Sequence, residues 1–388
     1  MHWPWCENKC PYCDFNSHVN KNYSEDEYIQ TLLKHIDYYA EKLGNRQVIS
    51  IFFGGGTPSL MQPSSINQIV EYINSRFSLD TSSAEISMEA NPSSSNLNKL
   101  KDFKNAGINR LSIGVQSFHD DLLNFLGRRH NKDQALSTIE NARTVFENVS
   151  TDLIYGLPNQ KLDAWQKDLE RILQFDLNHI SCYQLTIEKQ TAFYKQVISG
   201  EWEPILSDTQ ADFFDLTRET IVSQNMDKMV NYEISNFAKP NFECKHNVHV
   251  WQYQDYIGIG AGAHGRFTDH TGQYFLSQNI KMPNKYMYNI NNLNNFSFIL
   301  DHIAPEQSFG EMILMGLRLK NGIDMKNLHN NLFFKDNFNN DLNNWAEFKR
   351  MEQFGFVKKT DSHLQITTQG WPILDSITSN LLTSIQNT

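Results

Sequence analysis

The sequence of 388 residues contains little cysteine and no long apolar run. Its five cysteines are too few for a disulfide framework in so long a chain, and three of them lie within the first thirteen residues. This usage indicates a metal site in a reducing compartment, so we expect a cytoplasmic protein. No segment approaches the roughly 18 apolar residues of a membrane span, and no secretory leader pattern is present. We therefore expect a soluble protein that contacts a membrane, if at all, at its periphery.

Basic residues are also scarce. The chain has 34 Lys and Arg residues against 44 Asp and Glu residues, which gives a formal net charge of −10, and no Lys/Arg-rich run occurs. This balance disfavours a general nucleic-acid binder and also an RNA-modifying enzyme. The length is sufficient for two or three domains with a large core.

The strongest chemical signal is the Cys-x3-Cys-x2-Cys array of Cys6, Cys10 and Cys13. A four-iron cluster normally takes four thiolates, so three cysteines leave one iron open to a substrate or cofactor. The alternative is a closed zinc site with four ligands, in which His2 or His18 would be the fourth. We favour the cluster, because the glycine-rich segments downstream suit an open cofactor site better.

Strands and helices alternate over the first half of the chain. The apolar periodicity predicts helices at 23–43, 64–76, 97–105, 132–146 and 163–174, and strands at 48–53, 84–88, 110–115, 149–154 and 179–185. This alternation predicts an α/β fold with a parallel sheet, closed or partly closed into a TIM-like (β/α) barrel. Because the carboxyl ends of barrel strands carry the chemistry, the residues after the strands should share one rim with the cysteine loop. They are Gly54, Gly55, Gly56, Thr57, Glu89, Asn91, Gln116, Asp152 and Glu188.

The repeat fades beyond residue 190. We expect a helix at 207–224, an edge strand at 232–237, a glycine-rich loop at 255–265 and an Asn-rich linker with some helix at 270–300. Helices at 311–319 and 342–353 followed by short strands at 355–357 and 364–367 predict a small winged-helix-like α+β domain. The predicted domains are a barrel at 1–190, an extension at 191–300 and a C-terminal domain at 301–388.

The cysteine array, with Tyr12 before its last cysteine, resembles that of the radical S-adenosylmethionine (SAM) enzymes. In that family the amino and carboxylate groups of SAM chelate the open iron, and an electron from the cluster cleaves SAM to a 5′-deoxyadenosyl radical. The run from Gly54 through Gly55 and Gly56 to Thr57 resembles the family's methionine-binding motif. The resemblance implies a 4Fe-4S cluster and SAM as cofactors.

Five later segments resemble, in order, the coproporphyrinogen dehydrogenase or HemN-like branch of this superfamily. They are residues 52–59, 89–92, 112–118, 126–130 and 152–158, so that the resemblance covers nearly the whole chain. It implies that Glu89, Gln116, Arg128 and Asp152 contact SAM, with a carboxylate for its amino group, a guanidinium for its carboxylate and polar groups for its ribose.

Two features favour the HemW heme chaperones within that branch. The dehydrogenase has a fourth cysteine two positions beyond the third, where this chain has Phe15. Residues 246–251 resemble the HNxxYW motif of the HemW proteins, with Val250 in place of the tyrosine. The resemblance implies that heme is a ligand and that His246 is a candidate axial ligand, since imidazole commonly ligates heme iron. Weaker candidates are Cys244, His249 and His264.

The resemblance therefore implies a heme chaperone that carries a 4Fe-4S cluster with SAM. Such a protein would pass heme to membrane hemoproteins of the respiratory chain, with peripheral contact at the inner membrane, and the resemblance allows for a homodimer. The alternative is an enzyme that decarboxylates the propionates of coproporphyrinogen III without oxygen to give protoporphyrinogen IX. Phe15 argues against that alternative.

The N-terminal segment departs from the family pattern. Family members have a β-strand before the cysteine motif, whereas only residues 1–5 precede Cys6. Either the start codon is assigned too late or the first barrel strand is missing. We expect this to leave the neighbouring strand with unpaired backbone groups at its edge.

Overall fold

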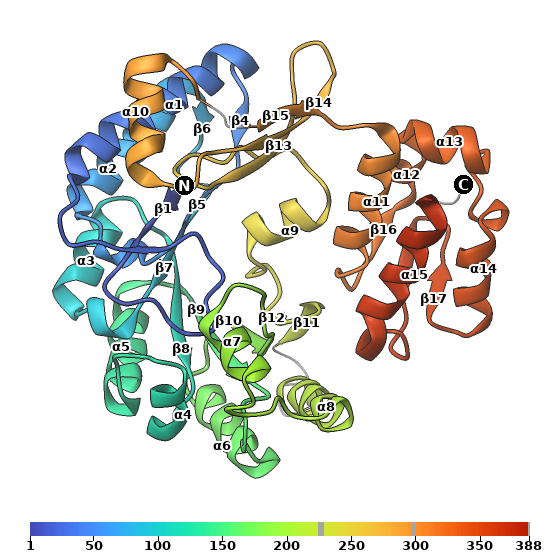
Figure 1. The fold of residues 1–388 in the computed structure, drawn as a ribbon, viewed down its shortest axis with the longest axis horizontal. Coiled ribbons are helices and arrows are strands. Elements are labelled where there is room, and N and C mark those ends of the chain that lie inside the picture. The colour runs from blue at the N-terminus through green and yellow to red at the C-terminus, as the bar shows by residue number, and fades with distance from the viewer. Residues whose placement is uncertain (224–228, 297–298, 387–388) are drawn as a thin grey trace.

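The computed structural model describes residues 1–223, 229–296 and 299–386, and its centre is a curved sheet surrounded by helices (Figure 1). The sheet has eight strands in the order β1-β5-β7-β8-β9-β10-β12-β11. All neighbours from β1 to β10 are parallel, whereas β12 and β11 add as an antiparallel pair. The bounds are β1 (His2–Trp3), β5 (Ser50–Gly55), β7 (Glu85–Ala90), β8 (Arg110–Gln116), β9 (Asn148–Tyr155), β10 (His179–Gln184), β11 (Val230–Glu233) and β12 (Asn236–Ala238).

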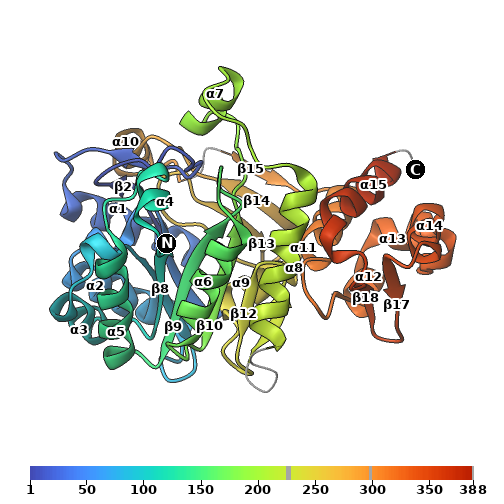
Figure 2. The ribbon, with the colours of Figure 1, turned by 90° about the horizontal axis from the view of Figure 1, so that it is seen from below.

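Helices follow the parallel strands and cover the convex side of the sheet (Figures 1 and 2). They are α1 (Glu25–Leu43), α2 (Pro63–Arg76), α3 (Leu97–Asn105), α4 (Asp120–Phe125), α5 (Lys132–Val145), α6 (Leu162–Leu173) and α8 (Ser207–Ser223). Ser24 caps α1 by accepting the N–H of Glu27, as the sequence pattern indicates. The predicted partial (β/α) barrel is therefore confirmed; the predicted end of the helix at residue 224 lies outside the described residues.

The strands of the barrel alternate apolar and polar side chains. In β7, Ile86 and Met88 join the buried apolar core, whereas Glu85, Ser87 and Glu89 lie on the other face. The concave interior of the barrel is consequently polar, and its carboxylates are available to a site.

Of the two alternatives for the N-terminal segment, a missing first strand is contradicted by the structure. Residues His2–Trp3 form β1 and pair in parallel with Gly54 and Gly55 of β5. The N–H of Gly54 donates to the carbonyl of Met1 at 3.0 Å, and that of Gly56 to the carbonyl of Trp3 at 2.6 Å. Trp3 of this short strand and the following Trp5 are buried in an aromatic cluster with Tyr23, which precedes α1, and with Tyr28 of α1.

The segment from 230 to 302 differs from prediction at two places. The expected single strand at 232–237 is broken into β11 and β12, because Ser235 turns the chain by donating its N–H to the carboxylate of Glu233. The expected Asn-rich linker contains regular structure: β13 (His264–Thr268), β14 (Tyr274–Gln278) and β15 (Ile299–His302) form an antiparallel sheet, with α10 (Pro283–Leu293) between the last two. Residues 245–251 form the helix α9 (Lys245–Trp251).

The C-terminal region, orange to red in Figure 2, has a separate apolar core, and backbone hydrogen bonds join it to the barrel at β11 and the residue that follows it. It combines helices with the three-stranded sheet β16-β18-β17, which confirms the predicted winged-helix-like character. Its elements are α11 (Pro305–Gly316), β16 (Ile323–Asp324), α12 (Met325–Asn330), α13 (Leu332–Phe338), α14 (Ala346–Gln353), β17 (Val357–Lys359), β18 (His363–Ile366) and α15 (Leu374–Gln386). Among the described residues, no helix combines the length and apolar character that a membrane crossing requires.

Candidate functional site

A cavity of about 480 Å³ lies beneath the cysteine loop, at the carboxyl ends of the barrel strands. The loop is closed at its base where β2 (Trp5–Cys6) pairs with β3 (His18–Val19). The predicted site residues other than Gly54 and His246 line this cavity, as do the rim residues Asn91 and Glu188. The site residues brought together here are Cys6, Cys10, Cys13, Gly55, Gly56, Thr57, Glu89, Gln116, Arg128 and Asp152.

Each cysteine of the loop is a free thiol with a polar neighbour. Thr57 Oγ1 donates to Cys6 Sγ at 3.2 Å, Arg128 Nη1 lies 3.8 Å from Cys10 Sγ, and Ser17 Oγ lies 4.0 Å from Cys13 Sγ. Such donors stabilise thiolates that ligate iron, although burial raises the pKa of Cys6 in the metal-free protein.

The three thiols lie beside one cavity. Among the described residues, no three His, Cys, Asp or Glu side chains converge as ligands of one metal ion. Cys6, Cys10 and Cys13 all line the cavity beneath the loop. The donor set and this arrangement fit a cluster of several irons better than a closed zinc site.

The glycine run at the end of β5 is required by close packing. Gly55 has φ +114°, and a Cβ there would lie 2.5 Å from His2 Nε2. A Cβ on Gly56 would lie 2.6 Å from the carbonyl oxygen of Trp5. The run therefore lets β5 approach the N-terminal segment, in addition to exposing backbone groups to the cavity.

Two carboxylates face the cavity from neighbouring strands. Glu89 Oε2 accepts the N–H of Gly55 at 3.1 Å, and Asp152 accepts the hydroxyl of Ser112 at 3.0 Å. Burial raises the pKa of Glu89 to about 8, and the nearby Asp152 contributes to the shift. Burial also raises the pKa of Asp152. Sequence reasoning missed Ser112, although its position two residues after Arg110 indicated an inward-facing side chain.

Arg128 connects the cysteine loop with the strand ends. Its Nη2 donates to the carbonyl of Gly114 at 2.8 Å and to Oδ1 of Asn91, while Nη1 donates to the hydroxyl of Tyr12 at 3.4 Å. The guanidinium thus faces both a cluster cysteine and the pocket. Gln116 ends β8 with φ +69°, an unusual conformation for a residue with a side chain.

His246 lies outside this cavity, near the amino ends of the strands. Glu85, the first residue of β7, accepts the N–H of Lys245 at 3.0 Å and that of His246 at 3.3 Å. The imidazole of His246 stacks on Phe52, with ring centroids 4.8 Å apart. Burial lowers the pKa of His246 to about 3, which keeps the imidazole in the neutral form that binds metals.

Of the weaker heme-ligand candidates, Cys244 shares the neighbour Glu85 with His246, whereas His249 and His264 have other surroundings. Cys244 is buried beside Glu85, with Sγ 3.4 Å from Oε1. His249 Nε2 bonds to the backbone carbonyl of Asp255 at 2.9 Å, and His264 begins β13.

Comparison with known proteins gives the family. Residues 1–172 match the family model of the Radical SAM superfamily, and residues 303–373 match the HemN C-terminal domain. The chain is 38% identical over 310 residues to heme chaperone HemW of Buchnera aphidicola (Schizaphis graminum), covering 80% of each chain. It is 32% identical over 378 residues to heme chaperone HemW of Bacillus subtilis, covering 95% of each chain. The chain belongs to the HemW family.

A solved structure agrees with this fold. Coproporphyrinogen III oxidase (HemN) of Escherichia coli has a TM-score of 0.80 and covers 98% of this chain and 89% of its own, at 22% identity. Membership of the radical SAM superfamily implies SAM and a 4Fe-4S cluster, and the relatives' name implies heme handling. The boundaries at residues 190 and 300 stay predictions, as do the roles of the individual site residues.

Proposed function

We propose that this chain is a heme chaperone with a SAM-binding 4Fe-4S site. Cys6, Cys10 and Cys13 would hold the cluster, which when bound supplies an open iron for the amino and carboxylate groups of SAM. Glu89 would pair with the amino group of SAM and Arg128 with its carboxylate, while Gln116 and Asp152 would hold the ribose. The observation that carries the proposal is the single cavity that these residues line, in a chain of the HemW family.

Heme is the proposed cargo. We propose that the chain binds heme and delivers it to membrane hemoproteins of the respiratory chain, with peripheral contact at the inner membrane and with a homodimer as one form. His246 is the proposed iron ligand carried over from the HNxxYW resemblance. Its neutral imidazole suits that role, but its ring would have to leave Phe52.

The second candidate function is a coproporphyrinogen III dehydrogenase, which the HemN-like fold supports. Phe15 opposes it: this side chain is 55% exposed near the cavity, at the position where that enzyme has a fourth cysteine. A chaperone should leave coproporphyrinogen III unchanged, whereas the dehydrogenase should convert it to protoporphyrinogen IX.

The test uses the full chain, reconstituted anaerobically with iron and sulfide and supplied with SAM and a reductant. We expect it to leave coproporphyrinogen III unchanged and to bind hemin, with a shifted Soret band. Formation of protoporphyrinogen IX would establish the enzyme instead. His246→Ala tests the ligand carried over from the resemblance: an altered Soret band with unchanged cluster iron would support the ligand role of His246, and an unaltered band would exclude it.

A further inference from the structure

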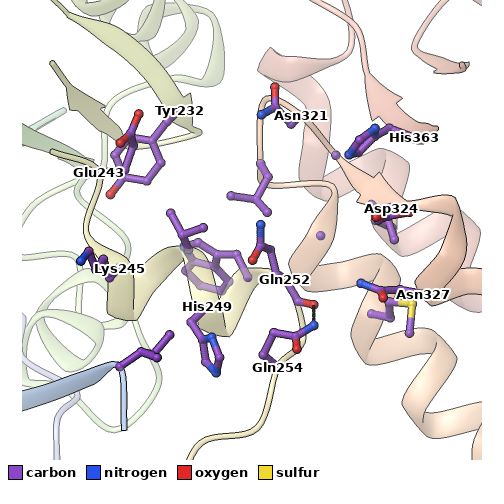
Figure 3. Close-up of a pocket in the computed structure, with 18 of the residues that line it drawn as sticks. Tyr232, Glu243, Lys245, His249, Gln252, Gln254, Asn321, Asp324, Asn327 and His363 are labelled. Carbon is purple, nitrogen blue, oxygen red and sulfur yellow. Dashed lines mark hydrogen bonds between the residues drawn. The ribbon is translucent and has the colours of Figure 1, made fainter. Parts of the chain in front are cut away.

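A second cavity of about 890 Å³ lies between the barrel and the C-terminal domain (Figure 3). One wall is α9, which contributes Val248, Trp251 and its C-cap Gln252. The facing wall belongs to the C-terminal domain and includes Ile323 and His363. We call this cavity the interdomain cleft. Its volume is in the range of pockets that hold large cofactors.

The helix α9 has two different faces because of its period of 3.6 residues. Lys245, Val248 and Gln252 follow the spacing of one face, and all three line the interdomain cleft. His246 is about 100° away on the helix and packs on Phe52 inside the barrel. The motif helix therefore separates the cleft from the interior of the barrel.

Contacts at the back of the cleft hold its two walls together. The backbone N–H of Ile234 donates to the carbonyl of Arg318 at 3.2 Å, and that of Lys320 to the carbonyl of Tyr232 at 2.9 Å. The guanidinium of Arg318 lies 3.4 Å from the fully buried carboxylate of Glu233 and 4.7 Å from the ring centre of Trp251. Backbone pairing, an ion pair and a cation–π contact thus preform the cleft.

We propose that the interdomain cleft is the heme seat, with His363 in place of His246 as an axial ligand of the iron, because His246 packs on Phe52 and does not line this cleft. The inference rests on the proposed heme-handling function and locates its site. Val248, Trp251 and Ile323 offer apolar surface to the macrocycle, and Asn321 and Asn327 offer amide donors to its propionates. The chemistry matches a flat apolar ligand with two carboxylates and an iron that takes imidazole.

One ring nitrogen of His363 has a hydrogen-bond partner in the neighbouring serine. The imidazole Nδ1 lies 2.8 Å from Ser362 Oγ, and in the tautomer in which Nδ1–H donates to this hydroxyl, Nε2 is free to bind a metal. Figure 3 shows His363 on the wall that faces α9. The nearby Asp324 accepts the N–H of Lys326 at 2.8 Å, so its carboxylate is engaged in capping α12.

The experiment titrates the full chain with hemin and follows the Soret band. We compare wild type with His363→Ala, which removes the ligand, and with Val248→Trp, which fills the cleft and leaves every histidine in place. His329→Ala is the matched control, because His329 is an exposed histidine of the same domain outside the cleft. We expect a dissociation constant at least about tenfold higher for both cleft variants, a shifted Soret band for His363→Ala, and no change for His329→Ala.

The outcomes distinguish failure of the heme-handling function from failure of the location in the cleft. If wild type does not bind hemin, the heme-handling function fails and the heme seat fails with it. If wild type binds hemin and both cleft variants bind it equally well, only the location in the cleft is overturned. Loss of binding in His246→Ala alone, with His363→Ala unaffected, would also overturn it and would place heme on the barrel face of α9. Circular dichroism of each variant excludes unfolding as the cause of a loss.

Discussion

The imidazole of His246 stacks on the phenyl ring of Phe52, with centroids 4.8 Å apart and ring planes 20° apart. Phe52 belongs to β5, whose end carries the glycine run, and a Cβ on Gly54 would lie 2.8 Å from the Phe52 ring. The stack therefore joins the motif helix α9 to the strand that leads to the candidate SAM site. It gives His246 a packing role that is independent of heme.

A double-mutant cycle measures this stack. We expect His246→Ala and Phe52→Ala each to destabilise the protein, and the pair to show a coupling free energy of about 0.5–1.5 kcal/mol, because the second substitution has no partner ring left to lose. Urea unfolding of the four proteins gives the coupling. Strict additivity of the two substitutions would show that the rings do not stabilise each other.

Glu89 should make stability depend on pH. Its pKa in the folded protein is about 8, well above that of a carboxyl group in the unfolded chain. The protonated form therefore stabilises the metal-free protein fully below the unfolded pKa, and this stabilisation is lost as pH rises through 8. Between pH 5 and pH 8.5, the free energy of unfolding of wild type should fall by about 1–2 kcal/mol relative to that of Glu89→Gln. This is less than the full pKa shift implies, because water in the cavity screens the carboxylate. Parallel pH curves of the two proteins, measured by urea unfolding, would contradict this.

Gly56→Ala should prevent assembly of the cluster site. The new Cβ would lie 2.6 Å from the carbonyl oxygen of Trp5, so the segment that carries Cys6 must shift. We expect a clear loss of iron and sulfide per chain after anaerobic reconstitution. Gly200→Ala is the control, because a Cβ there meets no atom within 4 Å. It adds only local strain from φ +77°, so retained iron content in Gly56→Ala would refute the packing argument.

Glu85 should be essential for the position of α9. Its carboxylate accepts two backbone N–H groups of α9 and lies 3.9 Å from the buried guanidinium of Arg110. Glu85→Ala leaves Arg110 buried without this partner, and we expect a loss of about 3–5 kcal/mol of unfolding free energy. Glu347→Ala removes an i,i+3 pair with the exposed Arg350 and should cost much less, because solvent screens exposed ion pairs. Equal losses in the two variants, by chemical denaturation, would contradict the prediction.

The sequence by itself determined the barrel and the composition of its rim. Apolar periodicity is a local property, so the strands and helices of the first half could be predicted, and α3 (Leu97–Asn105) has the predicted bounds. In a parallel sheet the carboxyl ends of all strands meet at one rim. This geometry is why the sequence alone predicts that Glu89, Gln116 and Asp152 lie near the cysteine loop.

Only the tertiary structure decided where the short and distant segments lie. A strand of two residues has no periodicity to detect, and β1 exists because Trp3 and Trp5 are buried against α1 and the segment before it. The position of α9 could not be predicted either. Its motif was assigned to cofactor binding, but the helix lies at the other end of the barrel from the cysteines. The interdomain cleft depends on contacts such as Arg318 with Glu233, which are 85 positions apart in the chain. Contacts over such separations arise from packing and backbone pairing between whole elements, which local sequence patterns do not encode.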